Sequence, residues 1–113
     1  MPVVNSSCAI PVTTQIASSS TETTIVPASP SGVYNNIVSW QITNASASAV
    51  TVTIKDSTAG TTRFVYDLAS NGGIVVYFPL PVVQSKAGAN WTATLSSGSV
   101  TVDINVQYVQ SNL

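Results

Sequence analysis

Apolar and polar residues alternate along the stretch from Val100 to Tyr108, where every second side chain is apolar. A period of two is typical of a β-strand with one buried face and one solvated face. The same alternation occurs in residues 91–95, and the Ser-Ser-Gly-Ser sequence of residues 96–99 has the composition of a turn. We therefore predict an antiparallel hairpin over residues 91–108, which needs further strands to cover its apolar face.

Similar strand patterns recur along the chain at residues 33–44, 50–55 and 63–68, at a spacing of roughly ten residues. Residues 44–48 have turn composition, so the first two of these segments are expected to form a second hairpin. No stretch shows the period of 3.6 that marks an amphipathic helix. The chain is therefore expected to be all-β. An antiparallel β-sandwich, with jelly-roll topology as one option, is favoured over a small barrel.

The run from Ile74 to Val83 departs from this pattern because it is apolar on both faces of any strand that it forms. Its two prolines lack a backbone N–H, which places the strand at the edge of a sheet. One face would cover the core, and the other would need a loop, the N-terminal segment or another subunit to cover it. We predict a subunit interface formed by Ile74, Val76, Phe78, Leu80, Val82 and Val83.

Residues 1–32 are rich in Ser, Thr and Pro, and the spacing of the prolines leaves no room for a helix of useful length. Two short pieces, residues 12–16 and 23–26, could pair as strands. We therefore divide the chain into an extended N-terminal arm at residues 1–32 and a β-sandwich domain at residues 33–113. The arm is either disordered in the monomer or ordered against a neighbouring subunit.

Charged residues make up only 6% of the chain, and the formal net charge is -1. Soluble domains average about 25% charged residues. The surface must therefore be built from Ser, Thr, Asn and Gln, which lose their hydration at a lower cost than ions and so favour association. The three cations, Lys55, Arg63 and Lys86, are too few for a nucleic-acid surface.

Neither a membrane partner nor export is expected. No apolar run approaches the roughly 18 residues of a membrane-spanning helix. The first cation is Lys55, so the beginning of the chain lacks the basic region of a secretory signal. We expect the protein to stay in the cytoplasm in which it is made.

Residues suited to catalysis or metal binding are scarce. The chain has no His, and Cys8 is its only cysteine, which excludes the usual catalytic triad, a zinc site and an internal disulfide. A carboxylate pair would require two of Asp56, Asp67 and Asp103 to converge, whereas Asp56 is expected in a solvated turn. The Ser-Lys pair at residues 85–86 is expected to point in two directions. We predict no catalytic site, no metal site and no cofactor.

The aromatic residues divide into two groups. Four of them are in phase with the aliphatic residues of their strands and are expected in the core: Trp40, Tyr66, Trp91 and Tyr108. Tyr34 and Tyr77 are not assigned in this way. They are candidate ligand-facing residues if the chain is a carbohydrate-binding or receptor-binding module.

Three segments, at residues 40–56, 68–82 and 89–95, follow a recognisable order of strand, small polar turn, strand, apolar run ending in prolines, and Asn-Trp-Thr. In this order the chain resembles small β-sandwich virion proteins of tailed bacteriophages over about residues 33–109. The resemblance implies a structural capsid decoration or cement protein, made in the host cytoplasm and located on the capsid surface of the virion. It also implies the major capsid protein and copies of the chain itself, often as a homotrimer, as partners. The alternative is a carbohydrate- or receptor-binding module of a head or tail fibre.

Overall fold

The structure, a computed structural model, describes residues 8–112, and over these residues the chain consists of β-strands and loops. The strands in chain order are β1 (Ile10–Ala17), β2 (Thr23–Val26), β3 (Tyr34–Asn44), β4 (Val50–Lys55), β5 (Thr62–Leu68), β6 (Gly73–Val82), β7 (Trp91–Leu95) and β8 (Thr101–Ser111). The predicted all-β class is confirmed. Within the described residues there is no helix of the length and apolarity needed to cross a membrane.

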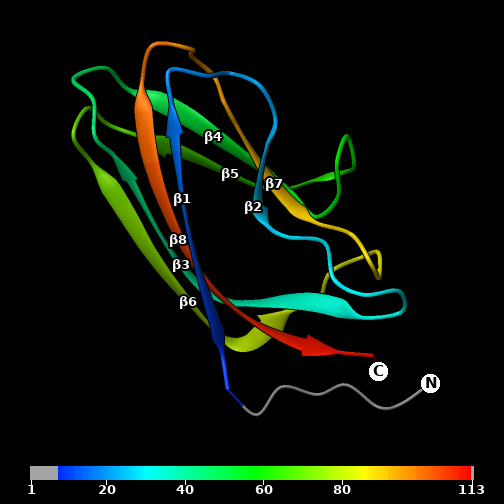
Figure 1. Cartoon of the computed structure of the whole chain (residues 1–113). Coiled ribbons are helices and arrows are strands. Elements are labelled where there is room, and N and C mark those ends of the chain that lie inside the picture. The colour runs from blue at the N-terminus through cyan, green and yellow to red at the C-terminus, as the bar shows by residue number, and fades with distance from the viewer. Residues whose placement is uncertain (1–7, 113) are drawn as a thin grey trace.

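The strands form two antiparallel four-stranded sheets that pack face to face (Figure 1). One sheet has the order β1-β8-β3-β6, and the other has the order β2-β7-β4-β5. Four of the antiparallel pairs are nested in the sequence, from the outermost to the innermost: β1–β8, β2–β7, β3–β6 and β4–β5. This is the jelly-roll arrangement of a β-sandwich.

The two strands expected in the N-terminal segment are present as β1 and β2, and both pair with strands of the same chain. All of β1 pairs with β8, while Ile16 of β1 and Ile25 of β2 are buried in the core. Residues 10–26 therefore complete the two sheets, which corrects the expectation of an arm set apart from the sandwich over this stretch. Residues 1–7 of that expected arm, and Leu113, lie outside the described residues.

The hairpins predicted at residues 91–108 and 33–55 are wrong, because β7 and β8 lie in different sheets, as do β3 and β4. Each short turn carries the chain from one sheet across to the other. The alternation is the same whether two strands lie side by side or face each other across a core, so it cannot distinguish the two arrangements. The crossing turns are fixed by backbone bonds such as Ala45 N to Thr101 O, at 2.9 Å.

Trp40 of β3 lies at the centre of an aromatic cluster between the sheets. Its ring makes edge-to-face contacts with Phe64, Tyr66, Phe78 and Trp91, at centroid distances of 5.1 to 6.2 Å. The Trp40 indole Nε1 also donates a hydrogen bond of 3.0 Å to the Tyr66 hydroxyl. Such contacts stabilise a core beyond the burial of apolar area, and they join strands from both sheets.

Candidate functional site

β6 forms one edge of its sheet and carries the apolar run for which contacts were predicted. Its register with β3 is interrupted: Ser39 pairs with Tyr77, but Ile37 pairs with Val82, so a step of two residues in β3 matches a step of five in β6. Residues 78–81 therefore lie opposite Val38 alone and form a bulge at the edge of the sheet. Both prolines of the run lie in this bulge, in agreement with the predicted edge position.

The structure divides the six predicted interface residues into two groups. Four of them are half-buried and pack against the core of their own chain: Ile74, Val76, Phe78 and Val82. Leu80 and Val83 are instead exposed, by 83% and 60% respectively. We call these two side chains the bulge surface. The first group is in phase with the core, so of the six predicted interface residues only Leu80 and Val83 are exposed enough for contact with another molecule.

The chain that follows the bulge surface is anchored by a buried amide. Gln84 is fully buried, and its Oε1 accepts a hydrogen bond of 2.9 Å from the backbone N of Asn35. Its Nε2 donates to the backbone oxygens of Asp56 and Ala89, at 3.0 and 2.9 Å. A buried amide whose donors and acceptor are all paired holds its neighbours in one arrangement. Gln84 thus joins the beginning of β3 to the loops that follow β4 and β6.

Asp56 is the buried charge beside this amide. Its Oδ2 accepts hydrogen bonds from the backbone N of Ser85, at 2.7 Å, and from Arg63 Nη1, at 2.5 Å. The same Arg63 nitrogen lies 3.2 Å from the backbone oxygen of Val83. The ion pair therefore connects β5 to the segment that carries the bulge surface.

The burial of Asp56 corrects the prediction that it lies in a solvated turn. Burial by itself would raise the pKa of Asp56, but the hydrogen bonds from Ser85 and Arg63 and the positive charge of Arg63 together hold its pKa below the ordinary value. The Asp56 Oδ1 atom is also buried, and it accepts no hydrogen bond from the described residues. This carboxylate stabilises the folded loops in its ionised form.

The other carboxylates considered for catalysis lie on strands of different sheets. Asp67 of β5 accepts a hydrogen bond of 2.7 Å from the Thr51 hydroxyl, and Asp103 of β8 accepts one of 2.8 Å from Gln15 Nε2. Both bonds join neighbouring strands on a sheet surface. Among residues 8–112 there is no group of three or more His, Cys, Asp or Glu side chains that could hold a metal ion.

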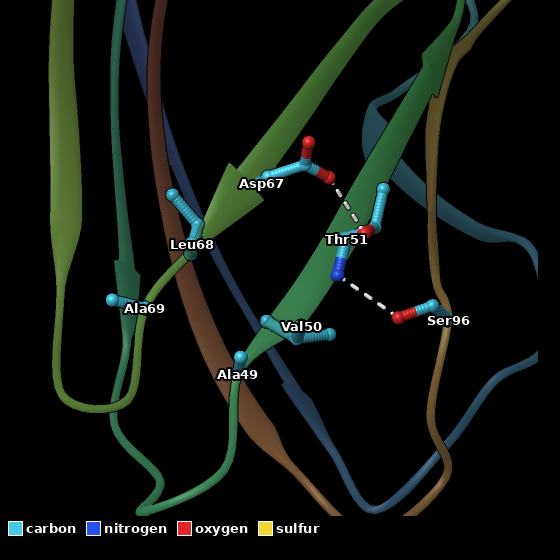
Figure 2. Close-up of a pocket in the computed structure, with 7 residues that line it drawn as sticks. All are labelled: Ala49, Val50, Thr51, Asp67, Leu68, Ala69 and Ser96. Atoms are coloured by element: carbon cyan, nitrogen blue, oxygen red, sulfur yellow. Dashed lines mark hydrogen bonds between the residues drawn. The ribbon is translucent and has the colours of Figure 1, made fainter.

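An open pocket of about 390 Å³ lies beside the ends of β4 and β5 (Figure 2). Thr51 is at its centre: the backbone N donates to Ser96 Oγ at 2.9 Å, and the hydroxyl donates to Asp67. The polar groups of this pocket are thus paired with one another. They leave no converging set of donors and acceptors for a ligand, and we assign none to it.

A second, shallow depression of about 280 Å³ lies across the β1-β8-β3-β6 sheet, and we call it the outer groove. The strand register aligns outward-facing side chains of the four strands in two neighbouring rows. The residues of each row come from β1, β8, β3 and β6 in that order. The first row is Thr13, Asn105, Gln41 and Val75. The second row is Pro11, Gln107, Ser39 and Tyr77. Seven of these eight residues line the depression, and Tyr77 stands beside Ser39 at the β6 end of its row.

Hydrogen bonds within the outer groove orient two of its amides. The Thr13 hydroxyl donates to Asn105 Oδ1 at 2.9 Å, and the Ser39 hydroxyl donates to Gln107 Oε1 at 3.2 Å. The nitrogens of these two amides, and the whole amide of Gln41, form no hydrogen bond with other residues in the range 8–112. The groove therefore presents donors and an acceptor that are not used within the described chain.

The two tyrosines named as candidate ligand-facing residues lie apart. Tyr77 is 68% exposed and stands beside the outer groove. Tyr34 is half-buried at the beginning of β3, where it pairs with Ser111 at the end of β8. They do not form one stacking surface.

Sequence analysis did not identify Gln41, Asn105 and Gln107 as site residues. Each occupies an unremarkable polar position of an alternating strand, and only the pairing of β3 with β8 brings them together. No protein-family model matches the chain, and no curated protein matches it in sequence.

Proposed function

We propose that this protein is a non-enzymatic structural protein of a phage particle, a capsid decoration or cement protein that stabilises the shell. The observation that carries the proposal is the bulge surface, where Leu80 is 83% exposed and Val83 is 60% exposed at the edge of a sheet. Two large apolar side chains that stay exposed within one short stretch of the chain are candidates for a contact site. The jelly-roll topology supports the proposal because viral capsid domains use it, and so does the resemblance to phage virion proteins.

The bulge surface is suited to side-chain contacts rather than to extension of the sheet. Pro79 and Pro81 remove two N–H donors from this edge, so a partner strand could not continue the ladder past them. Leu80, between the prolines, would insert into a recess of the partner. The Asp56–Arg63 pair and Gln84 hold the following segment in place, which lowers the entropy lost on binding.

The low charge of the chain is consistent with permanent burial in an assembly. With 6% charged residues, few ions would have to be dehydrated when the surface is covered. We propose the major capsid protein and copies of this chain, as a homotrimer, as its partners on the capsid surface.

A double variant tests the proposal. Leu80→Ser with Val83→Ser should keep the circular-dichroism spectrum of the native protein but lose self-association in analytical ultracentrifugation and lose binding to purified shells that lack the protein. Val65→Ser is the matched control, because Val65 is 56% exposed on β5 of the other sheet. Unchanged shell binding by the double variant, or an equal loss in the control, would contradict the proposal.

A second candidate is a carbohydrate- or receptor-binding module of a head or tail fibre. It is favoured by the exposure of Tyr77 beside a groove whose amide nitrogens form no hydrogen bond within residues 8–112, and lectin domains share the jelly-roll topology. Copy number distinguishes the two: quantitative mass spectrometry of purified virions should find hundreds of copies of a decoration protein but only a few copies of a fibre module.

A further inference from the structure

The outer groove is distinct from the bulge surface and has a different chemistry. Its lining includes the amide residues Gln41, Asn105 and Gln107 and the apolar residues Val75 and Pro11. All of these groups are uncharged. Amides can donate and accept hydrogen bonds at neighbouring atoms, which matches a ligand that carries hydroxyl groups on adjacent carbons.

The charges near the outer groove exclude an anionic ligand. No Lys or Arg lies on the strands of this sheet, since Lys55 and Arg63 belong to β4 and β5, and Lys86 lies in the loop after β6. Phosphate and carboxylate groups are usually held by such cations. The one carboxylate on this face, Asp103, is outside the groove lining and accepts a hydrogen bond from Gln15.

We propose that the outer groove binds a neutral oligosaccharide. Four strands spaced by about 4.8 Å make each row of side chains roughly 14 Å long, and the two rows are separated by about 7 Å. Such a footprint holds two linked pyranose rings laid across the strands. The volume of about 280 Å³ lies just below the range of roughly 300 to 1,000 Å³ for drug-sized ligands, which fits one or two sugar units on an open surface.

The groove also supplies an apolar contact for the carbon-bound face of a sugar. Tyr77 is 68% exposed and Val75 is 74% exposed, and the two lie at the β6 ends of the rows. A tyrosine ring offers an apolar face together with a polar hydroxyl. A ring stacked on Tyr77 would have its hydroxyls directed toward Ser39 and the Gln107 amide in the same row, and toward the Gln41 amide in the neighbouring row.

The groove is built to keep this geometry without the ligand. Its side chains project from paired strands, and the bonds from Thr13 to Asn105 and from Ser39 to Gln107 fix two amide oxygens. A site on rigid elements loses less entropy on binding than one on loops. The inference does not depend on the structural role proposed above, because Leu80 and Val83 take no part in the groove.

The first test uses the unaltered protein. It is titrated, with detection by NMR, with neutral di- to pentasaccharides of hexose and N-acetylhexosamine units and with sialylated and sulfated versions of them. We expect the backbone amide signals of Gln41, Val75 and Asn105 to shift with a neutral member of the panel. The proposal is overturned if no neutral oligosaccharide shifts these signals at millimolar concentration, if the shifts map to the Thr51 pocket, or if the anionic versions bind more tightly.

Variants then assign the binding to the groove. Gln41→Ala and Asn105→Ala should each weaken binding roughly tenfold, as when a hydrogen-bonded pair is removed. Tyr77→Ala should weaken it similarly, whereas Tyr77→Phe, which keeps the ring, should retain it. Thr53→Ala, on β4 of the other sheet, is the control and should bind as the native protein does. If Gln41→Ala abolishes self-association but leaves sugar binding intact, the groove is a protein interface and the proposal is wrong.

Discussion

Arg63 Nη1 lies 2.5 Å from Oδ2 of Asp56, so that the chain's buried carboxylate is neutralised by a cation whose side chain is 28% exposed. The guanidinium group of Arg63 also lies 5.9 Å from the ring centre of Trp91 and donates to the backbone of Val83. One side chain therefore stabilises a buried charge, covers a core aromatic ring and positions the segment that carries the bulge surface.

We expect Arg63→Met to lower the free energy of unfolding by about 3 kcal/mol, because it leaves Asp56 buried without its cation. The methionine retains much of the apolar stem, so the loss reports mainly on the charge. Urea denaturation followed by tryptophan fluorescence measures it. Lys86→Met is the control: Lys86 is an exposed loop residue, and its replacement should change stability by less than about 0.5 kcal/mol. Equal effects of the two substitutions would show that the pair does not stabilise the fold.

Stability should fall in acid, and Asp56 should account for part of the fall. Its pKa is lower in the folded protein than in the unfolded chain, so the ionised group stabilises the fold at pH values above the unfolded pKa. That stabilisation is lost as the pH falls through the lower, folded value. Urea denaturation over a series of pH values should give a steeper acid decline for the native protein than for Asp56→Asn. Parallel declines would contradict this assignment.

Gln84→Ala should cost about 3 kcal/mol of unfolding free energy, since it opens a cavity and leaves the backbone N of Asn35 buried without its acceptor. Gln15→Ala is the matched amide control. Gln15 is exposed and forms a hydrogen bond with Asp103 on the sheet surface, so its loss should cost less than about 1 kcal/mol. Thermal denaturation of the two variants compares them, and similar melting temperatures would contradict the role of Gln84.

Deletion of residues 1–20 should unfold the sandwich, because it removes all of β1 and uncovers one edge of β8. A point substitution makes the same test. Ile16→Ala should lower the free energy of unfolding by about 3 kcal/mol, because Ile16 is buried in the core. Thr13→Ala is the control on the exposed face of β1 and should lower it by less than about 1 kcal/mol. Hydrogen exchange of the β8 amides provides the measurement. If the deleted protein kept native protection in β8, the segment would be an arm after all.

Much of the fold follows from local pattern. The alternation at residues 50–55 and 100–108 predicted strands whose alternate side chains are indeed buried, and the prolines after Phe78 predicted an edge strand. The Ser-Asn-Gly-Gly sequence of residues 70–73 has turn composition, and Asn71 adopts the left-handed conformation, with φ of 54°, that Asn tolerates better than most residues.

Other features depend on contacts between distant parts of the chain. Asp56 follows a strand directly and reads as a turn residue, yet it is buried because Arg63 and Ser85 compensate its charge. Val75 belongs to a run that is apolar on both faces, and only its pairing with Gln41 places it on the wall of a polar groove. Neither outcome has a local signal.

The alternation of apolar and polar residues is enough to predict most of the strands and the apolar face of each, because this alternation depends only on the geometry of the strand's own backbone. Tertiary structure alone decided which sheet each strand joins, which residues of the β6 run stay exposed, and which amides meet on the outer face. The reason is physical: a short turn can join two neighbours in one sheet or cross to the facing sheet with the same side-chain pattern. The choice depends on burying all the apolar faces around one core.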